Sequence, residues 1–103
     1  MFDSKIGKLG QTVIARSLAE AMEASKETRE AICSAFSRYL AGDWGDTAEK
    51  DKQRNDRAVE APGKDRILAR YNLARGSVLI ITEWDRSNTA IMHFAAESRK
   101  ESQ

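Results

Sequence analysis

The last third of the chain constrains the fold most, because its apolar residues follow the two-residue period of β-strands. The segment "RILARYNL" (66–73) alternates between its two faces, and "SVLIITEW" (77–84) is apolar on both, which favours a central strand. A third strand is predicted in "TAIMHF" (89–94). Short turn sequences, "ARG" with the permissive Gly76 and then "DRSN", separate the three segments. The sequence therefore predicts a three-stranded antiparallel meander.

Helices are predicted before the meander. The most regular covers 25–42, with Gly42 as its C-terminal stop. Its apolar face consists of Ile32, Ala35, Phe36, Tyr39 and Leu40. A shorter helix, about 18–24, begins with the capping-box spacing of Ser17 and Glu20. A brief strand is predicted in "GQTVIAR", before that helix.

A third predicted helix, about 47–60, is almost wholly polar. Asp46 with Glu49, or Thr47 alone, supplies its N-cap. If the helix packs through its few small apolar residues, Asp51 and Asn55 are carried toward the rest of the protein. Polar side chains in such positions require hydrogen-bond partners.

These elements together define an α+β fold. It consists of a short N-terminal strand, three helices and a three-stranded antiparallel meander, with the helices packed on one face. A length of 103 residues corresponds to one domain. We expect this domain to span 1–96, followed by a disordered C-terminal tail at 97–103.

Composition argues against several classes of protein. Seventeen basic and sixteen acidic residues give a net charge of +1, which does not indicate a nucleic-acid partner. The longest apolar run, Val78 to Ile81, is far shorter than the roughly 20 residues of a membrane span. The first ten residues lack the apolar region of a secretory signal. We therefore expect a cytoplasmic protein without a membrane partner.

The chain has one cysteine and one histidine. Cys33 is predicted to be a small core residue, because it falls on or beside the apolar face of the long helix. His93 has apolar neighbours and is predicted to be a structural or exposed strand residue.

Four stretches of the sequence resemble those of a known family. They are "LGQTVIAR", "AGDWGD" followed by Asp51 and Asn55, "RILARY", and "IITEWDRSNT". Together they are similar to a family of short uncharacterised bacterial proteins, many encoded on plasmids or other mobile elements, with the motifs GDWGD and IITExDRSxT. The resemblance covers about Leu9 to Ile91 and implies a plasmid-related bacterial protein without naming a function.

The resemblance also marks the residues that matter in that family. They are Gly42, Asp43, Trp44, Gly45, Asp46, Asp51, Asn55, Arg66, Tyr71, Thr82, Glu83, Asp85, Arg86, Ser87 and Thr89. Two departures stand out. Trp84 occupies a position where relatives commonly have a small residue, and the ending "HFAAESRKESQ" replaces their usual C-terminal segment.

Nine residues form the candidate site. They are Asp43, Trp44, Asp46, Asp51, Asn55, Glu83, Trp84, Asp85 and Arg86. One interpretation is structural, with Arg86 using its five N–H donors to bridge the "GDWGD" loop and the "EWDRSN" turn, so that the polar helix is held on the sheet. In a second interpretation the five carboxylates surround a pocket and bind a hard cation or act as acid and base. Because no standard metal or nucleotide motif accompanies them, we predict no cofactor and no metal.

The function favoured by the sequence is that of a non-enzymatic module that binds another protein. Its candidate surface surrounds Trp44, Trp84 and Arg86, because Trp and Arg are enriched among binding hot spots. The alternative is a toxin similar to the RelE/ParE group, acting on RNA or the ribosome, which the order of elements suggests. Its residues would be Arg66, Arg70, Tyr71, Arg86 and His93. The nearly neutral chain argues against that alternative, since ribosome-directed proteins are usually strongly basic.

Overall fold

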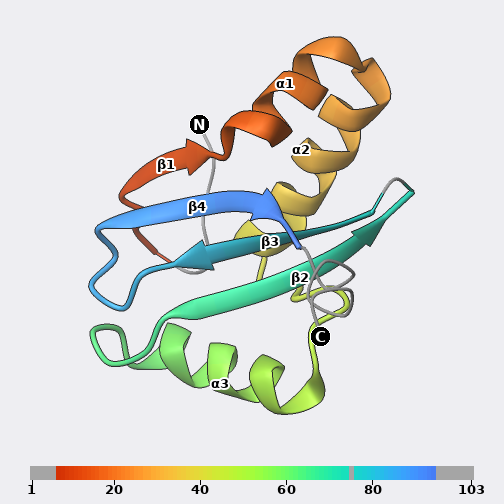
Figure 1. Ribbon diagram of the computed structural model, residues 1–103. Coiled ribbons are helices and arrows are strands. Elements are labelled where there is room, and N and C mark those ends of the chain that lie inside the picture. Colours follow the sequence, from red (N-terminus) through yellow and green to blue (C-terminus); the bar gives the residue numbers. More distant parts are fainter. Residues whose placement is uncertain (1–6, 75, 95–103) are drawn as a thin grey trace, which may run out of the picture.

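The computed structural model describes residues 7–74 and 76–94 of the chain (Figure 1). The elements in this part are β1 (Gln11–Ile14), α1 (Arg16–Ala24), α2 (Lys26–Leu40), α3 (Glu49–Glu60), β2 (Ile67–Leu73), β3 (Gly76–Thr82) and β4 (Asn88–His93). The predicted α+β class is confirmed. The predicted tail, 97–103, lies outside the described residues.

The strands form one mixed sheet in the order β1-β4-β3-β2. β2, β3 and β4 are antiparallel neighbours, as the meander predicts. β1 joins the same sheet parallel to β4, with Val13 opposite Ala90. The meander is therefore three strands of a four-stranded sheet. The sequence predicted strand β1 but not its pairing with β4, because two strands so far apart in the chain leave no local sequence pattern that identifies them as partners.

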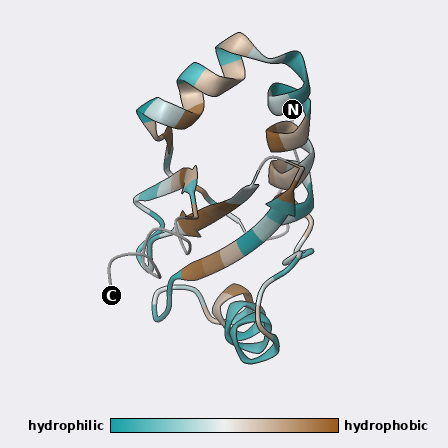
Figure 2. Cartoon of the chain, turned by 45° about the vertical axis from the view of Figure 1, so that its right-hand side comes forward, coloured by the Kyte–Doolittle hydropathy of each residue, from teal (hydrophilic) through white to brown (hydrophobic). Residues whose placement is uncertain are grey.

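Helix α2 covers one face of the sheet, and α1 packs against α2 (Figure 1). The core lies between α2 and this face, and its members include Ile32, Ala35, Tyr39, Ile67, Ala69, Tyr71, Val78, Ile80 and Ile91. Figure 2 shows brown, apolar segments on the strands and a mostly teal, polar α3. α3 lies beside β2 at the edge of the sheet, so the prediction that all helices pack on one face is wrong.

A chain of buried hydroxyl groups crosses this core. The Tyr39 hydroxyl lies 2.7 Å from the hydroxyl of Thr82, which lies 2.8 Å from that of Thr89. The Thr89 hydroxyl donates to the carbonyl of Leu9 at 2.8 Å. Because unpaired polar groups are costly inside a core, this chain fixes the position of α2 relative to β3 and β4. Burial raises the pKa of Tyr39 well above its usual range, so this hydroxyl stays protonated.

The helix ends agree only in part with the predicted caps. The Ser25 hydroxyl accepts a hydrogen bond from the Thr28 N–H at the start of α2. At its other end Gly42, with φ 82°, allows the N–H groups of Gly42 and Asp43 to bond to the carbonyls of Tyr39 and Arg38. This pair of bonds is the Schellman arrangement, so the predicted stop is confirmed.

The capping predictions for the other two helices are wrong. α1 begins at Arg16, one residue before the expected cap Ser17, and its N-cap Ala15 provides no side-chain bond. α3 begins at Glu49 after Ala48, again without a side-chain cap. In α3 the expected capping residue is engaged elsewhere, as described below.

Cys33 and His93 are both exposed. Cys33 is exposed on α2, so its prediction as a core residue is wrong: it lies one position beyond the buried Ile32 and turns away from the sheet. His93 is exposed at the end of β4, as one of its predicted alternatives allowed. Within the described part of the chain, no helix combines the length and apolar character needed to cross a membrane.

A close approach after α2 gives the first test of this fold. Gly45 has φ 63° and forms an isolated bridge to Arg70, and a Cβ at this position would overlap the ring of Tyr71. Gly63 has φ 99° with open space around it, so it serves as the matched control. Both Ala variants incur about 1–2 kcal/mol of backbone strain, and Gly45→Ala adds about 1–3 kcal/mol of overpacking. Urea unfolding should therefore show the larger loss for Gly45→Ala, whereas equal losses would contradict the packing described.

Candidate functional site

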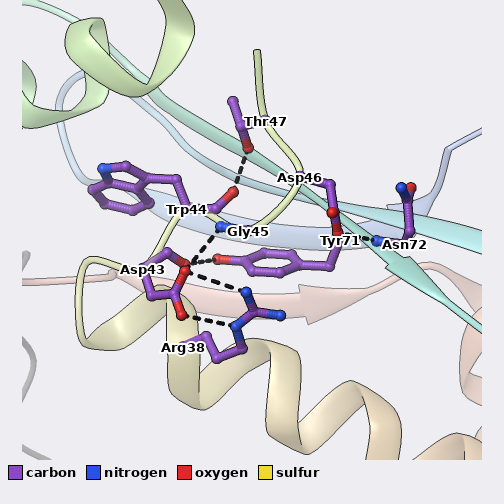
Figure 3. A network of polar contacts seen from close by, with 8 residues as sticks. All are labelled: Arg38, Asp43, Trp44, Gly45, Asp46, Thr47, Tyr71 and Asn72. Atoms are coloured by element: carbon purple, nitrogen blue, oxygen red, sulfur yellow. Dashed lines mark hydrogen bonds and ion pairs between the residues drawn. The ribbon is translucent and has the colours of Figure 1, made fainter. Parts of the chain in front are cut away.

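Asp43 organises the loop that follows α2 (Figure 3). Its carboxylate accepts hydrogen bonds from Arg38 Nε at 2.9 Å and from the Gly45 N–H at 3.1 Å. These two donors hold the pKa of Asp43 below its usual range. The same Arg38 guanidinium lies over the ring of Tyr71, 5.3 Å from its centroid. The Tyr71 hydroxyl in turn donates to the Asp43 carbonyl at 2.8 Å.

Trp44 is a core residue of this loop. Its side chain is only 5% exposed, and its ring meets that of Tyr39 edge-on at a centroid distance of 5.7 Å. The indole Nε1–H donates to Asp56 Oδ1 on α3 at 2.8 Å. Trp44 therefore joins α2, the loop and α3, and little of it is left for contact with a partner.

Asn55 connects α3 to the backbone of β2. It is 2% exposed, its Nδ2 donates to the Leu68 carbonyl at 2.9 Å, and its Oδ1 accepts from the Leu68 N–H at 3.1 Å. This pair of bonds is the one that a neighbouring strand would make with Leu68. The prediction that Asp51 and Asn55 face the protein is confirmed for Asn55, whereas Asp51 is only partly buried.

The loop before α3 continues the same pattern along β2. The Thr47 hydroxyl donates to the Trp44 carbonyl and accepts from the Arg70 N–H at 2.9 Å. The Asp46 N–H donates to the Arg70 carbonyl at 2.8 Å, and the Asp46 carboxylate accepts from the Asn72 N–H at 2.8 Å. Thr47 is thus not the N-cap of α3, because its hydroxyl is committed to the sheet.

Together, Asp46, Thr47 and Asn55 form what we call the edge cap of β2. Leu68, Arg70 and Asn72 direct their backbone groups away from β3, and the edge cap satisfies five of those groups. Exposed edge strands promote unwanted pairing with other chains, and proteins commonly cover them. The "GDWGD" loop and Asn55 therefore complete the sheet at its β2 edge.

Arg86 holds the opposite turn, between β3 and β4. Its Nη2 donates to the Ala58 carbonyl in α3 at 2.9 Å, and its Nη1 donates to the carbonyls of Asp65, Glu83 and Trp84, each at 3.2 Å. Its backbone is left-handed, with φ 62°. The prediction that Arg86 bridges the turn and the "GDWGD" loop is wrong, because its hydrogen bonds run to backbone carbonyls of α3, of Asp65 and of the turn itself. They still tie the turn to the polar helix α3.

The other turn residues have different roles. The Asp85 carboxylate accepts from the Ser87 N–H at 3.0 Å, and hydrogen bonding from Ser87 lowers the pKa of Asp85. The Glu83 N–H donates to the Asn88 carbonyl at 3.0 Å, which closes the turn. Trp84 is 54% exposed and projects from a turn whose backbone is fixed on both sides.

The five candidate carboxylates do not gather around one pocket. Asp43 and Asp46 lie in the loop after α2, Asp51 lies on α3, and Glu83 and Asp85 lie in the β3–β4 turn. A cavity of about 80 Å³ is lined by Asp51, Arg54, Asn55, Arg66 and Leu68. Among the described residues, no group of three or more His, Cys, Asp or Glu side chains is arranged to hold a metal ion.

The residues considered for a toxin lie in different environments. Tyr71 is fully buried, and Arg86 is engaged with carbonyl groups. The Arg70 guanidinium lies over the Phe94 ring at 4.5 Å from its centroid. His93 is exposed at the end of β4.

Two residues of the site were not singled out from the sequence. Arg38 pairs with Asp43, and Asp56 accepts from Trp44. A basic residue in the last turn of a helix is a common feature, which gave no reason to pair Arg38 with the loop. Asp56 is one of many charged residues on α3, so its partner becomes apparent only when α3 is docked.

Comparison of the sequence with protein-family models gives no match, and searches of curated proteins and of solved structures give none either. The residues themselves therefore carry the functional argument.

The edge cap gives a second test. Asn55→Ala should lower the free energy of unfolding by about 2–6 kcal/mol, because the N–H and the carbonyl of Leu68 both lose their partner, at about 1–3 kcal/mol for each unsatisfied group. Gln53→Ala removes an exposed amide from the same helix and is the matched control. Chemical denaturation of the two variants measures the difference. If Asn55→Ala and Gln53→Ala cost the same, Asn55 does not hold α3 on β2.

Proposed function

We propose that this chain is a non-enzymatic binding module that contacts another protein through its β3–β4 turn. The observation that carries the proposal is the exposure of Trp84. Trp84 is 54% exposed, and it is one of three large hydrophobic residues that are exposed in the described part of the chain. Trp is among the residues that most often dominate the binding energy of protein interfaces.

Hydrogen bonds within the chain hold the turn in place without a partner. Arg86 donates to the carbonyls of the two peptide groups that flank the Cα of Trp84, those of Glu83 and Trp84, and to the carbonyl of Ala58 in α3. The Arg86 N–H also donates to the Glu83 carbonyl at 2.9 Å. A contact residue on a fixed backbone loses less conformational entropy on binding than one on a mobile loop. Arg86 in this proposal positions Trp84, and does not itself contact the partner.

The residues beside Trp84 indicate the chemistry of the partner. Glu83 precedes Trp84 in the sequence and Asp85 follows it, so an acidic residue flanks the tryptophan on each side. A complementary surface would offer an apolar pocket for the indole with Lys or Arg side chains at its rim. The proposal also keeps the expectation, raised by the motifs, of a bacterial accessory protein encoded on a plasmid or another mobile element.

A site-specific cross-linking experiment tests this function. A photoreactive phenylalanine analogue replaces Trp84 in the full chain, and the matched control carries it at Ser34, an exposed position on α2. Irradiation of source cells should yield a cross-linked protein of discrete mass from position 84 and none from position 34. Trp84→Ala should then weaken binding of that purified protein at least about tenfold in a titration, with an unchanged circular dichroism spectrum. No cross-link at position 84, or unchanged affinity of Trp84→Ala, would contradict the proposal.

A further inference from the structure

The sheet has a second face that no helix of the described chain covers. In Figure 1, α2 passes behind the sheet, α1 lies above it beside α2, α3 lies at its lower edge, and no helix lies in front of it. Side chains that alternate with the buried core residues point to this front face. Its central row crosses all four strands, through Leu68, Ile81, Ala90 and Val13.

This open face is apolar where a solvated face would be polar. A second row, beside the first, contains Leu79 and Met92 opposite each other. Sheets with one face in water usually alternate apolar and polar residues, yet β3 is apolar on both faces. Val13 is 43% exposed, and the five other residues of these two rows are partly exposed. The six residues Val13, Leu68, Leu79, Ile81, Ala90 and Met92 define the open face.

The charges around the open face are few. Among the residues of the four strands, Arg70 is the one charged side chain that points to this side, and it stacks on Phe94. The chain as a whole has a net charge of +1, so two copies repel each other only weakly. The nine residues after Phe94, "AAESRKESQ", include only two apolar residues, both alanines, and so bring little apolar surface that could cover six such side chains. The six residues before Gly7, "MFDSKI", bring three apolar side chains, which are fewer than the six of the open face.

We propose that the open face binds a second copy of this chain. The two copies are related by a two-fold axis that runs parallel to the strands, between the two sheets and in line with the gap between β3 and β4. In this arrangement β3 packs opposite the partner's β4, and β2 packs opposite the partner's β1. Large side chains then meet smaller ones: Ile81 faces the second copy's Ala90, and Leu68 faces the second copy's Val13. Such alternation of large and small residues is what allows two layers to pack closely.

The same arrangement keeps like charges apart. Arg70 lies on the outer strand β2, so the two copies of Arg70 fall on opposite sides of the interface, three strand spacings or roughly 14 Å apart. That separation exceeds the Debye length of about 8 Å at physiological ionic strength. Face-to-face packing of two sheets is also a common architecture in single chains.

The size of the open face predicts how strong the association is. Four strands spaced by about 4.8 Å span about 19 Å, and two rows about 7 Å apart cover about 14 Å along the strands, so the footprint is roughly 270 Å², well below the roughly 800 Å² per partner of a standard interface. The dimer is therefore weak and reversible. It forms at high concentration and dissociates on dilution.

Sedimentation velocity of the full chain tests this proposal, because one copy has a mass of 11.5 kDa. Between about 10 µM and 1 mM, a range suited to a weak interface, the average mass should rise toward twice that value. Val13→Lys and Leu79→Lys should each keep the chain monomeric over this range. Ile14→Lys is the matched control, because Ile14 is 39% exposed on the same strand but points to the other face. It should dimerise as the parent does.

Three outcomes would overturn the proposal. If the parent chain stays at 11.5 kDa up to about 1 mM, the open face does not bind a second copy. It is then covered by the chain's own residues or exposed to water. A dimer that persists in Val13→Lys uses another surface. Equal loss of the dimer in Val13→Lys and Ile14→Lys would place the contact at the β1 edge. If Leu79→Lys does not fold, Val13→Lys alone decides, because its position on an exposed edge strand tolerates a charged side chain.

Discussion

The backbone hydrogen bonds on the outer edge of β2 are the constraint on which the rest of the structure depends. Leu68, Arg70 and Asn72 each present groups that a fifth strand would normally satisfy, and the edge cap satisfies them with side chains and loop backbone. A net contribution of about 0.5–1.5 kcal/mol per bond is modest. Leaving such groups buried and unpaired costs more, so the loop, α3 and β2 have to fold as one unit.

This constraint explains why α3 is nearly all polar and still ordered. Only Asn55 and Ala58 of α3 are buried, which is too little apolar surface to hold a helix by packing alone. The helix is instead attached by Asn55 to β2, by Asp56 to Trp44, and by the carbonyl of Ala58 to Arg86. Arg86 thereby links the capped edge to the turn that presents Trp84, so the same network that completes the sheet also orders the proposed contact surface.

Some of this organisation was predictable from the sequence. The two-residue period located the meander, helical spacing located α2, and the few small residues of α3 were enough to predict that Asn55 faces inward. Thr47 shows where such reasoning fails. A Thr before a helix looks like an N-cap, but the Thr47 hydroxyl accepts a hydrogen bond from the Arg70 N–H instead. Arg70 is 23 residues away in the chain, so nothing near Thr47 in the sequence indicates this bond.

The same limit applies to partners that are distant in the chain. The parallel pairing of β1 with β4 and the carbonyl acceptors of Arg86 depend on the tertiary arrangement, and so does the outward turn of Cys33. The enrichment of Trp and Arg among binding hot spots placed Trp44, Trp84 and Arg86 together on one candidate surface. The structure separates their environments, because Trp44 is buried in the core while Arg86 fixes a turn and leaves Trp84 exposed.

Amide hydrogen exchange measured residue by residue tests the edge cap most directly. If side chains and loop backbone complete the sheet, the amides of Leu68 and Arg70 should exchange as slowly as the central Ile80 amide, with protection of at least about 10³-fold. The Thr12 amide on the outer edge of β1, to which the described residues offer no hydrogen-bond acceptor, provides the internal comparison, since its neighbours Gln11 and Val13 direct their backbone toward β4. Exchange of Leu68 and Arg70 as fast as that of Thr12 would contradict this account.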